Sequence, residues 1–440
     1  MAISTSIPII FEPASAPAPR ARLRFNVERP LCIALLLSSM GMVGALTGAT
    51  HRAATPEAEM RLPSIVTEGV LNLLGMLLVV MRWRRVVRAG RAAWPLVALT
   101  AFALFSSAWS VHPLLTLRRA ALLLVSTAIA CYMGERYSVE EFASLAARAL
   151  CVFMLLTVFC RLVAPSYVVD EFGSWKGLSG YKNAFGEHMA VAVLLLLLVR
   201  FRSNWPRYFF LLLAVALLGL SRSVSSLLLC AAMIAVLPVL HFSRSPLPRR
   251  SLTYGISTAA VAAAAWWGAT HWPMLFQALG RDPTLSGRTL LWLLVTPAVL
   301  RHPMLGYGYG SAFWAGLQGE ALNIWTQSRW LAPRADNGYL DLCLDVGLVG
   351  ASLLLFLWAR ALRRAIAFRE FHEGAIALWP LAYLSFFALH GISESTLLSS
   401  GDLPFFVFSV LSISLMFRHP RTAPAHARFA RHSGVPVSSR

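Results

Sequence analysis

Hydrophobic positions along this chain are collected in long runs, with few of the short alternations that soluble helices and strands show. Most runs are roughly 16–22 residues long, which suits a helix that crosses a hydrocarbon core about 30 Å thick. We therefore predict about twelve membrane-spanning helices. The predicted spans are approximately 31–50, 64–81, 93–110, 114–133, 145–164, 184–200, 208–220, 224–241, 251–270, 337–358, 375–395 and 403–417.

Two long polar segments, 165–183 and 271–336, separate these runs. Inside the second, Thr289–Leu300 is apolar but too short to cross a membrane, and Pro297 interrupts it. We predict an interfacial or re-entrant helix there. The sequence thus predicts an all-α polytopic membrane protein with a large loop carrying short helices. Its parts are a basic tail at 1–30, a membrane domain at 31–417 and a second basic tail at 418–440.

Composition agrees with a membrane protein and gives its orientation. The chain is 57% hydrophobic and 13% charged, well below the charged fraction of a soluble protein. The net charge of +19 comes mainly from arginines in short loops, so we interpret it as a topology signal and predict no binding of nucleic acid. Positive residues stay on the cytoplasmic side, which places both tails there and both long segments outside.

Polar groups inside predicted spans gather near their outer ends. Asn337, Asp341 and Asp345 have the spacing of one helix face, and Asp345 would lie about 12 Å along that helix. His390 and Glu394 form a second i, i+4 pair, and Glu187 and His188 begin another span. Such groups are costly in a membrane, which favours a functional site, although hydrogen bonds between helices would also explain them.

Arg222 lies between two serines with almost no loop around it. Its planar guanidinium suits a phosphate, while an ion pair with a nearby carboxylate is the structural alternative. Lys176 and Lys182, the lysines of the chain, lie in the 165–183 segment, where an anionic ligand or lipid headgroups would explain them.

The glycine-rich string and the cysteines limit the kinds of site that the chain can form. The string from Gly306 to Gly310 follows no strand, so it predicts a tight turn rather than a dinucleotide site, with its two tyrosines as candidates for stacking on a sugar. The six cysteines lie in or beside apolar runs and form no C-x-x-C pair. We predict no metal and no cofactor, and a site that works through arginine electrostatics and a carboxylate or histidine base.

Four strings resemble the O-antigen ligase and polymerase superfamily, over roughly residues 170–350. They are K-G-L-S-G-Y-K-N-A-F-G at 176–186, S-R-S at 221–223, G-R-T-L-L-W at 287–292 followed by P-M-L-G-Y-G at 303–308, and N-G-Y-L-D at 337–341 followed by G-L-V-G at 347–350. The last string is most similar to exopolysaccharide polymerases of the ExoQ type.

The resemblance implies a GT-C-like membrane fold and a metal-independent, inverting glycosyltransferase. It would take a glycan from an undecaprenyl-pyrophosphate donor at the periplasmic face of a bacterial inner (cytoplasmic) membrane and transfer it to an acceptor hydroxyl. The two functional arginines of the family fall on Arg222 and Arg288. The motif residues expected to bind substrate are Lys176, Lys182, Asn183, Asn337, Tyr339 and Asp341. A chain-length regulator and the lipid bilayer are the expected partners, besides the lipid-linked oligosaccharide.

One position departs from the ligase pattern. Ligases of this superfamily carry a histidine directly before the asparagine, and here Asp336 stands before Asn337. A carboxylate is a common base in inverting glycosyl transfer, so Asp336 is our candidate, with Asp341 and His390 as alternatives. This change favours a polymerase over a ligase that joins polymer to lipid A–core. A transporter or flippase of lipid-linked sugar is a third hypothesis, and the one-sided clustering of polar groups argues against it.

Overall fold

The structure is a computed structural model, and it describes residues 27–47, 62–201, 203–242, 287–316 and 319–417. Over these ranges the chain forms helices and connecting turns, together with one isolated bridge between Val169 and Trp175. The predicted all-α class is confirmed. The two tails, the predicted span 251–270 and the first part of the 271–336 loop lie mostly or wholly outside the described residues.

The elements follow the predicted apolar runs. In the first half the α-helices are α1 (Glu28–Ser39), α2 (Met42–Thr47), α3 (Leu62–Met81), α4 (Trp83–Ala92), α5 (Trp94–Phe105), α6 (Pro113–Arg136), α7 (Val139–Val163), α8 (Pro165–Val168), α9 (Lys182–Leu198) and α10 (Asn204–Leu220). In the second half they are α11 (Val224–Phe242), α13 (Arg288–Arg301), α14 (Gly319–Ser328), α15 (Gly338–Phe371), α16 (Trp379–His390) and α17 (Leu403–Phe417). Short 3₁₀ turns are η2 (Ser106–Ala108), η3 (Gly177–Ser179), η4 (Ala312–Trp314) and η5 (Ala375–Leu378).

Five described helices are long and apolar enough to cross a membrane, or six if α4 and the helix after it count as one broken span. Three further apolar helices of 10–17 residues include α10 and α17. The chain is thus a multi-pass membrane protein, while the number twelve stays a prediction.

Several predicted boundaries were wrong because helices extend beyond their apolar runs. The predicted 134–144 loop is mostly helical, since α6 ends at Arg136 and α7 begins at Val139. Ser138 and Glu141 form a reciprocal capping box there, in which each side chain accepts from the backbone N–H of the other residue.

The run predicted as one span at 31–50 is instead divided at Gly41, which has a φ of 81°.

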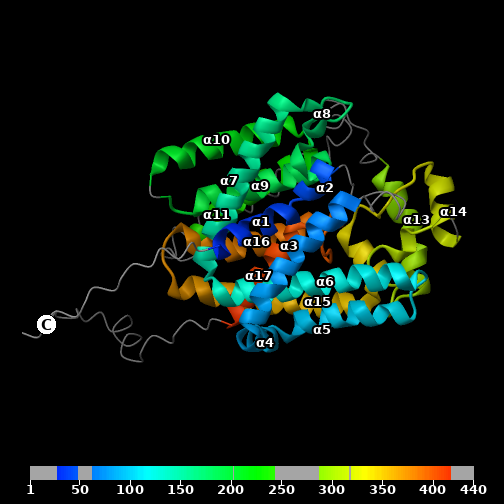
Figure 1. The fold of residues 1–440 in the computed structure, drawn as a ribbon. Helices are drawn as coiled ribbons and strands as arrows, with labels where there is room; N and C mark the ends of the chain where they lie inside the picture. The colour runs from blue at the N-terminus through cyan, green and yellow to red at the C-terminus, as the bar shows by residue number, and fades with distance from the viewer. Residues whose placement is uncertain (1–26, 48–61, 202, 243–286, 317–318, 418–440) are drawn as a thin grey trace, which may run out of the picture.

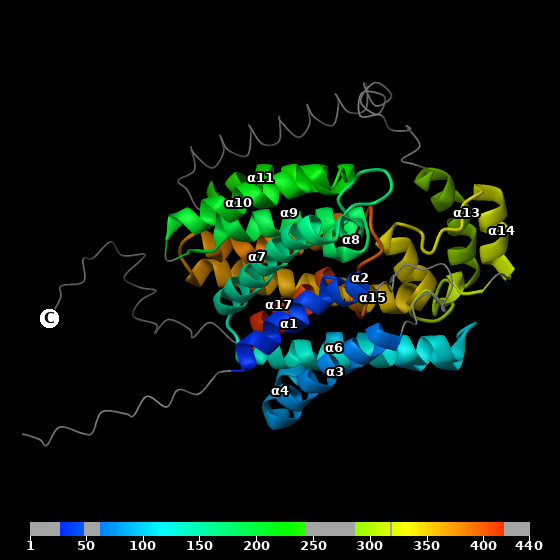
Figure 2. The ribbon, with the colours of Figure 1, turned by 45° about the horizontal axis from the view of Figure 1, so that its top comes forward.

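The helices pack side by side as a bundle (Figure 1). In both views α13 and α14, the short helices of the long loop, lie together at one end of it, and α4 lies away from them (Figures 1 and 2). Figure 1 shows α4 at the end of α5 that is away from α13. Helix α17 is buried at the centre, packed on α6, α15 and α16. Phe387 of α16 stacks on Phe408 of α17 with ring centroids 4.3 Å apart.

Helix α15 is broken at Gly347, which has φ 61° and ψ −168°, a conformation open almost only to glycine. The 303–310 segment closes the gap: Tyr307 and Gly308 donate their N–H groups to the carbonyls of Leu344 and Asp345, at 2.6 and 3.1 Å. In the other direction, Leu348 N–H donates to the carbonyl of Pro303 at 2.7 Å. The backbone groups freed by the break are therefore bonded to this segment.

Candidate functional site

The glycine-rich segment 303–311 is held between α15 and α6. It lies between the break of α15 and the start of α6, where Thr116 donates to the carbonyl of Tyr309 at 3.0 Å. Gly308 is required by close approach, because a Cβ there would come within 2.3 Å of the Ser110 hydroxyl. The predicted turn is thus present, and it is clamped on both sides.

The tyrosines of this segment do not present their rings to a ligand. Tyr307 is 8% exposed and Tyr309 is 2% exposed, so the expectation that they stack on a sugar is wrong for this conformation. The Tyr307 hydroxyl donates to the carbonyl of Ala298 at 2.9 Å and lies 3.1 Å from Glu320. Burial raises the pKa of both tyrosines above the usual range, so their hydroxyls stay protonated.

The face formed by Asn337, Asp341 and Asp345 is turned toward protein. Asn337 caps α15, since its side-chain oxygen accepts from the N–H groups of Tyr339 and Leu340 at 3.0 and 3.2 Å. Asp345 accepts from the N–H groups of Gly310 and Ser311 at 3.0 and 2.9 Å.

Asp341 lies between these two and is equally occupied. It accepts from the Trp314 indole at 3.1 Å, from the Ala335 N–H at 3.0 Å and from the Ser395 hydroxyl. A carboxylate that already accepts bonds from three segments is suited to fastening them together. This geometry disfavours Asp341 as the proton acceptor.

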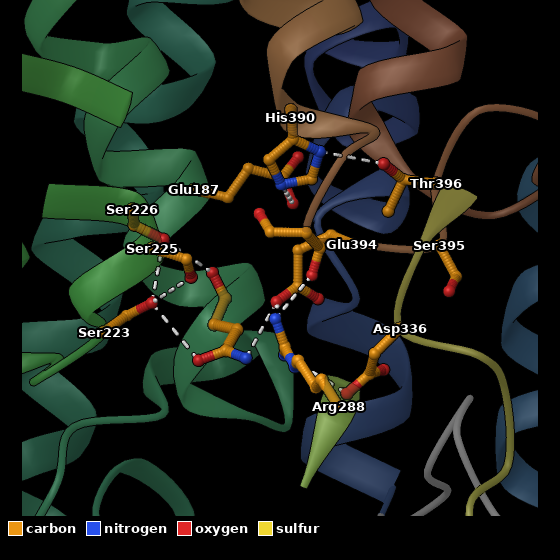
Figure 3. Close-up of polar contacts among 12 residues, drawn as sticks. Glu187, Ser223, Ser225, Ser226, Arg288, Asp336, His390, Glu394, Ser395 and Thr396 are labelled. Carbon is orange, nitrogen blue, oxygen red and sulfur yellow. Dashed lines mark hydrogen bonds and ion pairs between the residues drawn. The ribbon is translucent and has the colours of Figure 1, made fainter. Parts of the chain in front are cut away.

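Arg288 is the centre of a polar cluster, which we call the Arg288 cluster and which comprises Arg288, Asp336, Glu394 and Asn183. Arg288 is the first residue of α13 and follows Gly287, whose φ is 83°. Its Nη2 atom lies 3.1 Å from Oδ2 of Asp336 and 3.2 Å from Oε1 of Glu394 (Figure 3). Its Nη1 atom donates to the carbonyl of Ser393 at 2.7 Å.

Asn183 connects this cluster to the S-R-S element. Its amide nitrogen donates to Oε1 of Glu394 at 2.8 Å, and its amide oxygen accepts from the Ser223 hydroxyl at 3.2 Å. The hydroxyl of Ser226 lies 3.0 Å from that of Ser223 and donates to the Asn183 carbonyl at 3.3 Å. The start of α9, the start of α11, the start of α13 and the turn after α16 therefore meet at one place.

The two carboxylates of the Arg288 cluster differ in exposure. The side chain of Asp336 is 12% exposed and that of Arg288 is 15% exposed, whereas that of Glu394 is 3% exposed. Asp336 also has a positive φ of 51°, a strained conformation of the kind that concentrates at functional sites. Of the two carboxylates in the cluster, Asp336 is therefore the one more open to a ligand.

A second buried pair lies beside the cluster. Nε2 of His390 is 3.1 Å from Oε2 of Glu187, and Nδ1 of His390 is 2.9 Å from the Thr396 hydroxyl (Figure 3). The predicted His390–Glu394 pair on one helix was wrong, because α16 ends at His390 and Glu394 lies in the following turn. His390 therefore pairs with α9, and Glu394 pairs with α13.

The remaining predicted residues, apart from Tyr339, lie in or against the 165–183 segment. Arg222 has a φ of 51° and an exposed side chain, and its Nη1 atom donates to the carbonyl of Phe172 at 3.2 Å. Lys176 and Lys182 are both half-buried. Lys176 directly precedes η3, and Lys182 is the first residue of α9. Tyr339 is 43% exposed, and its hydroxyl donates to the carbonyl of Ala388 at 2.7 Å. The structure thus connects Arg288 and Asp336 directly. It connects Asn183 to Arg288 through Glu394, and Arg222 to Asn183 through its neighbour Ser223.

The cluster combines one cation with two carboxylates, which suits a site that removes a proton and stabilises nearby negative charge. Within the described ranges, no three His, Cys, Asp or Glu side chains are grouped as metal ligands would be. The sequence singled out Glu394 only as the partner of His390 and gave it no catalytic or substrate-binding role. Its position in an apolar stretch was a signal, but its partners Arg288 and Asn183 are more than a hundred residues away in the sequence.

Comparison with known proteins gives two matches. Residues 208–355 match the family described as O-antigen ligase. The exopolysaccharide production protein ExoQ of Rhizobium meliloti (strain 1021) is 25% identical over 301 residues, which is 64% of this chain and 68% of that protein. The family match includes Arg222, Arg288 and Asp336, whereas Asn183 and Glu394 lie outside it.

Proposed function

Starting from an O-antigen ligase/polymerase-like family, which the two matches support, we propose that this membrane protein polymerises lipid-linked oligosaccharide repeat units into an exopolysaccharide. The donor is a glycan on undecaprenyl pyrophosphate, and the reaction takes place at the periplasmic face of the inner membrane. The observation that carries the proposal is the pairing of Arg288 with Asp336 at 3.1 Å, at the accessible edge of a buried cluster.

The proposed reaction inverts the anomeric carbon of the donor. Asp336 accepts the proton of the acceptor hydroxyl, and the resulting oxygen attacks the anomeric carbon on the face opposite the pyrophosphate. A new glycosidic bond forms as the bond to the pyrophosphate oxygen breaks, and its electron pair leaves with undecaprenyl pyrophosphate. Nearby cations stabilise that developing charge.

Arg288 and Arg222, the two arginines proposed to stabilise the departing pyrophosphate, have different surroundings. Arg288 faces two carboxylates, so part of its charge is already balanced in this conformation. Arg222 has an exposed side chain beside the 165–183 segment. We therefore propose that Arg222, with Lys176 and Lys182, receives the pyrophosphate, and that Arg288 both orients Asp336 and contributes to charge stabilisation.

The first prediction concerns Arg288. In a strain that lacks the gene, a copy carrying Arg288→Ala should fail to restore high-molecular-weight polysaccharide, with elongation by purified protein lowered roughly 10²–10³-fold. Single repeat units on undecaprenyl pyrophosphate should accumulate. Gel electrophoresis of polysaccharide and chromatography of extracted lipid-linked glycans measure both.

Arg301→Ala is the matched control, because Arg301 ends the same helix and pairs with Glu320 at 2.6 Å on the surface. It should restore polymer to the wild-type level. Unchanged polymer in the deletion strain and in the Arg288→Ala strain would show that the proposed function is wrong.

The ligase is the second candidate, because the matched family is described by that activity. Loss of a ligase would leave polymer intact and lipopolysaccharide uncapped, so one gel distinguishes the two enzymes. Elongation of glycan by the purified protein in detergent, without an ion gradient, would exclude transport as its main activity.

A further inference from the structure

Helix α4 connects α3 to α5 and is bent by 95° from the helix that follows it. One side of α4 packs on α6 and α17 through Val86, Ala89 and Gly90, which are all buried. The other sides face outward. A short helix that turns sharply away from the apolar helix after it has the geometry of a segment lying along a membrane surface.

The outward side of α4 carries a basic stripe, which we define as Arg84, Arg88 and Arg91. These residues have the i, i+4, i+7 spacing of one helix face, extend over about 10 Å and are exposed. The segment Trp83–Ala92 contains no acidic residue. Like charges at this spacing repel one another weakly, and a nearby anionic surface would offset that cost.

The nearby carboxylate of Glu135 does not face this stripe. Its ion pairs are with Arg82 and Arg85, each at 3.6 Å, on the side of α4 toward α6. The basic stripe is thus distinct from the arginines that fasten α4 to the bundle.

Exposed apolar side chains lie beside the basic stripe. Trp83 is 57% exposed and Val87 is 42% exposed, and they occupy the adjacent sector of the helix. Tryptophan is enriched at the boundary between hydrocarbon and headgroups. An apolar sector next to a basic one is the arrangement by which a surface helix places one side in acyl chains and the other among phosphates.

The stripe is remote from the Arg288 cluster. Glu135, which pairs with α4, lies at the end of α6. The 303–311 segment, which follows α13, contacts the start of α6 through Thr116. Helix α6 has 24 residues and is about 36 Å long. Both views also place α4 away from α13 and α14 (Figures 1 and 2).

We propose that α4 is a binding surface for anionic phospholipid headgroups, with Arg84, Arg88 and Arg91 contacting their phosphates and Trp83 and Val87 entering the acyl region. The partner is the membrane in which the protein lies, on the side predicted to be cytoplasmic. Charge complementarity identifies this occupant, because an uninterrupted basic stripe beside an apolar sector matches a negatively charged lipid surface. The proposal is independent of the proposed enzymatic function.

The test uses the purified full chain in detergent and a fluorescent phosphatidylglycerol, with fluorescent phosphatidylcholine as the neutral lipid. Wild-type protein should bind phosphatidylglycerol more tightly. The triple variant Arg84→Gln, Arg88→Gln, Arg91→Gln should weaken that binding about tenfold or more, because each basic residue near an anionic surface contributes to it. The variant with lysine at the three positions should keep most of the binding and controls for folding.

A second triple variant, Arg360→Gln, Arg363→Gln, Arg364→Gln, removes the same charge from α15 and should bind phosphatidylglycerol as wild type does. An equal loss in both glutamine variants, or no loss in the α4 variant, would overturn the proposal. Millimolar inorganic phosphate should not displace the lipid. Full displacement would mean that the site takes free phosphate rather than a lipid surface, and would also overturn it.

Discussion

Glu394 and Asp336 share one arginine, yet their surroundings assign them different tasks. Glu394 is nearly closed to solvent and also accepts from Asn183 at 2.8 Å, so it holds the start of α9 against the start of α13. The side chain of Asp336 is the more exposed of the two, at 12% against 3% for Glu394. A base must reach the proton that it removes, which favours Asp336 over Glu394.

Exchange of each carboxyl group for its amide should separate these tasks. Asp336→Asn should lower elongation by purified protein about 10²-fold or more, with little change in Tm, because an amide cannot accept the proton. Glu394→Gln should lower the Tm more, because Arg288 loses a charged partner in a buried place. Elongation assays and thermal unfolding in detergent measure the two effects.

Asp336→His provides a control for chemistry at this position. An imidazole can accept a proton, so this variant should retain measurable elongation where Asp336→Asn does not. Full activity of Asp336→Asn would show that another group is the base, and His390, paired with Glu187 at 3.1 Å, would be the next candidate.

At the scale of elements, the break of α15 at Gly347 should be sensitive to any side chain. A Cβ at Gly347 would come within 2.3 Å of the Met304 carbonyl group, and its φ of 61° disfavours other residues. Gly347→Ala should therefore destabilise the protein by roughly 2–4 kcal/mol, from backbone strain and overpacking together. Thermal unfolding in detergent should show a lower Tm.

Gly69→Ala is the matched control, since Gly69 lies in α3 and a Cβ at that position would have no neighbouring atom within 4 Å. Alanine is favoured over glycine inside a helix, so the Tm should stay equal or rise. Equal Tm values for Gly347→Ala and wild type would mean that the break can be relieved without cost.

Sequence reasoning located helices well where apolar runs and helices coincide, as in α10 and α17. It failed where a helix continues through polar residues: α15 extends to Phe371, and the arginines predicted as a connector form α4. Helix formation depends on the absence of breakers as well as on apolarity, so hydropathy alone places such ends too early.

The candidate site was predictable only in part, for a physical reason. The motif strings led to Arg288, Asp336 and Asn183 as candidates, and the structure brings these three together. Glu394 joins these three residues, and His390 pairs with Glu187. Both arrangements depend on contacts between segments that are distant in the sequence. Helix periodicity carries no information on such contacts, and it wrongly paired His390 with Glu394.

At the scale of the whole molecule, orientation is the main prediction to test. Reporter fusions should give alkaline phosphatase activity when the enzyme is inserted after Phe172, and none when it is inserted after Arg88 or at the C-terminus. The arginine-rich connectors should stay in the cytoplasm, and the 165–183 segment should be outside. Activity at Arg88 with none at Phe172 would reverse the topology and remove the Arg288 cluster from the periplasmic face.

The pairing of the 303–310 segment with α15 also bears on how the chain is inserted into a membrane. The carbonyls of Leu344 and Asp345 and the N–H of Leu348 bond to a segment that is translated before them. In hydrocarbon each such group would cost several kcal/mol if it stayed unbonded. The order of synthesis suits this need, because the earlier segment is already available when α15 emerges. Helix α15 thus depends on another segment for its completion, which makes this docking a step in biogenesis before it is part of any site.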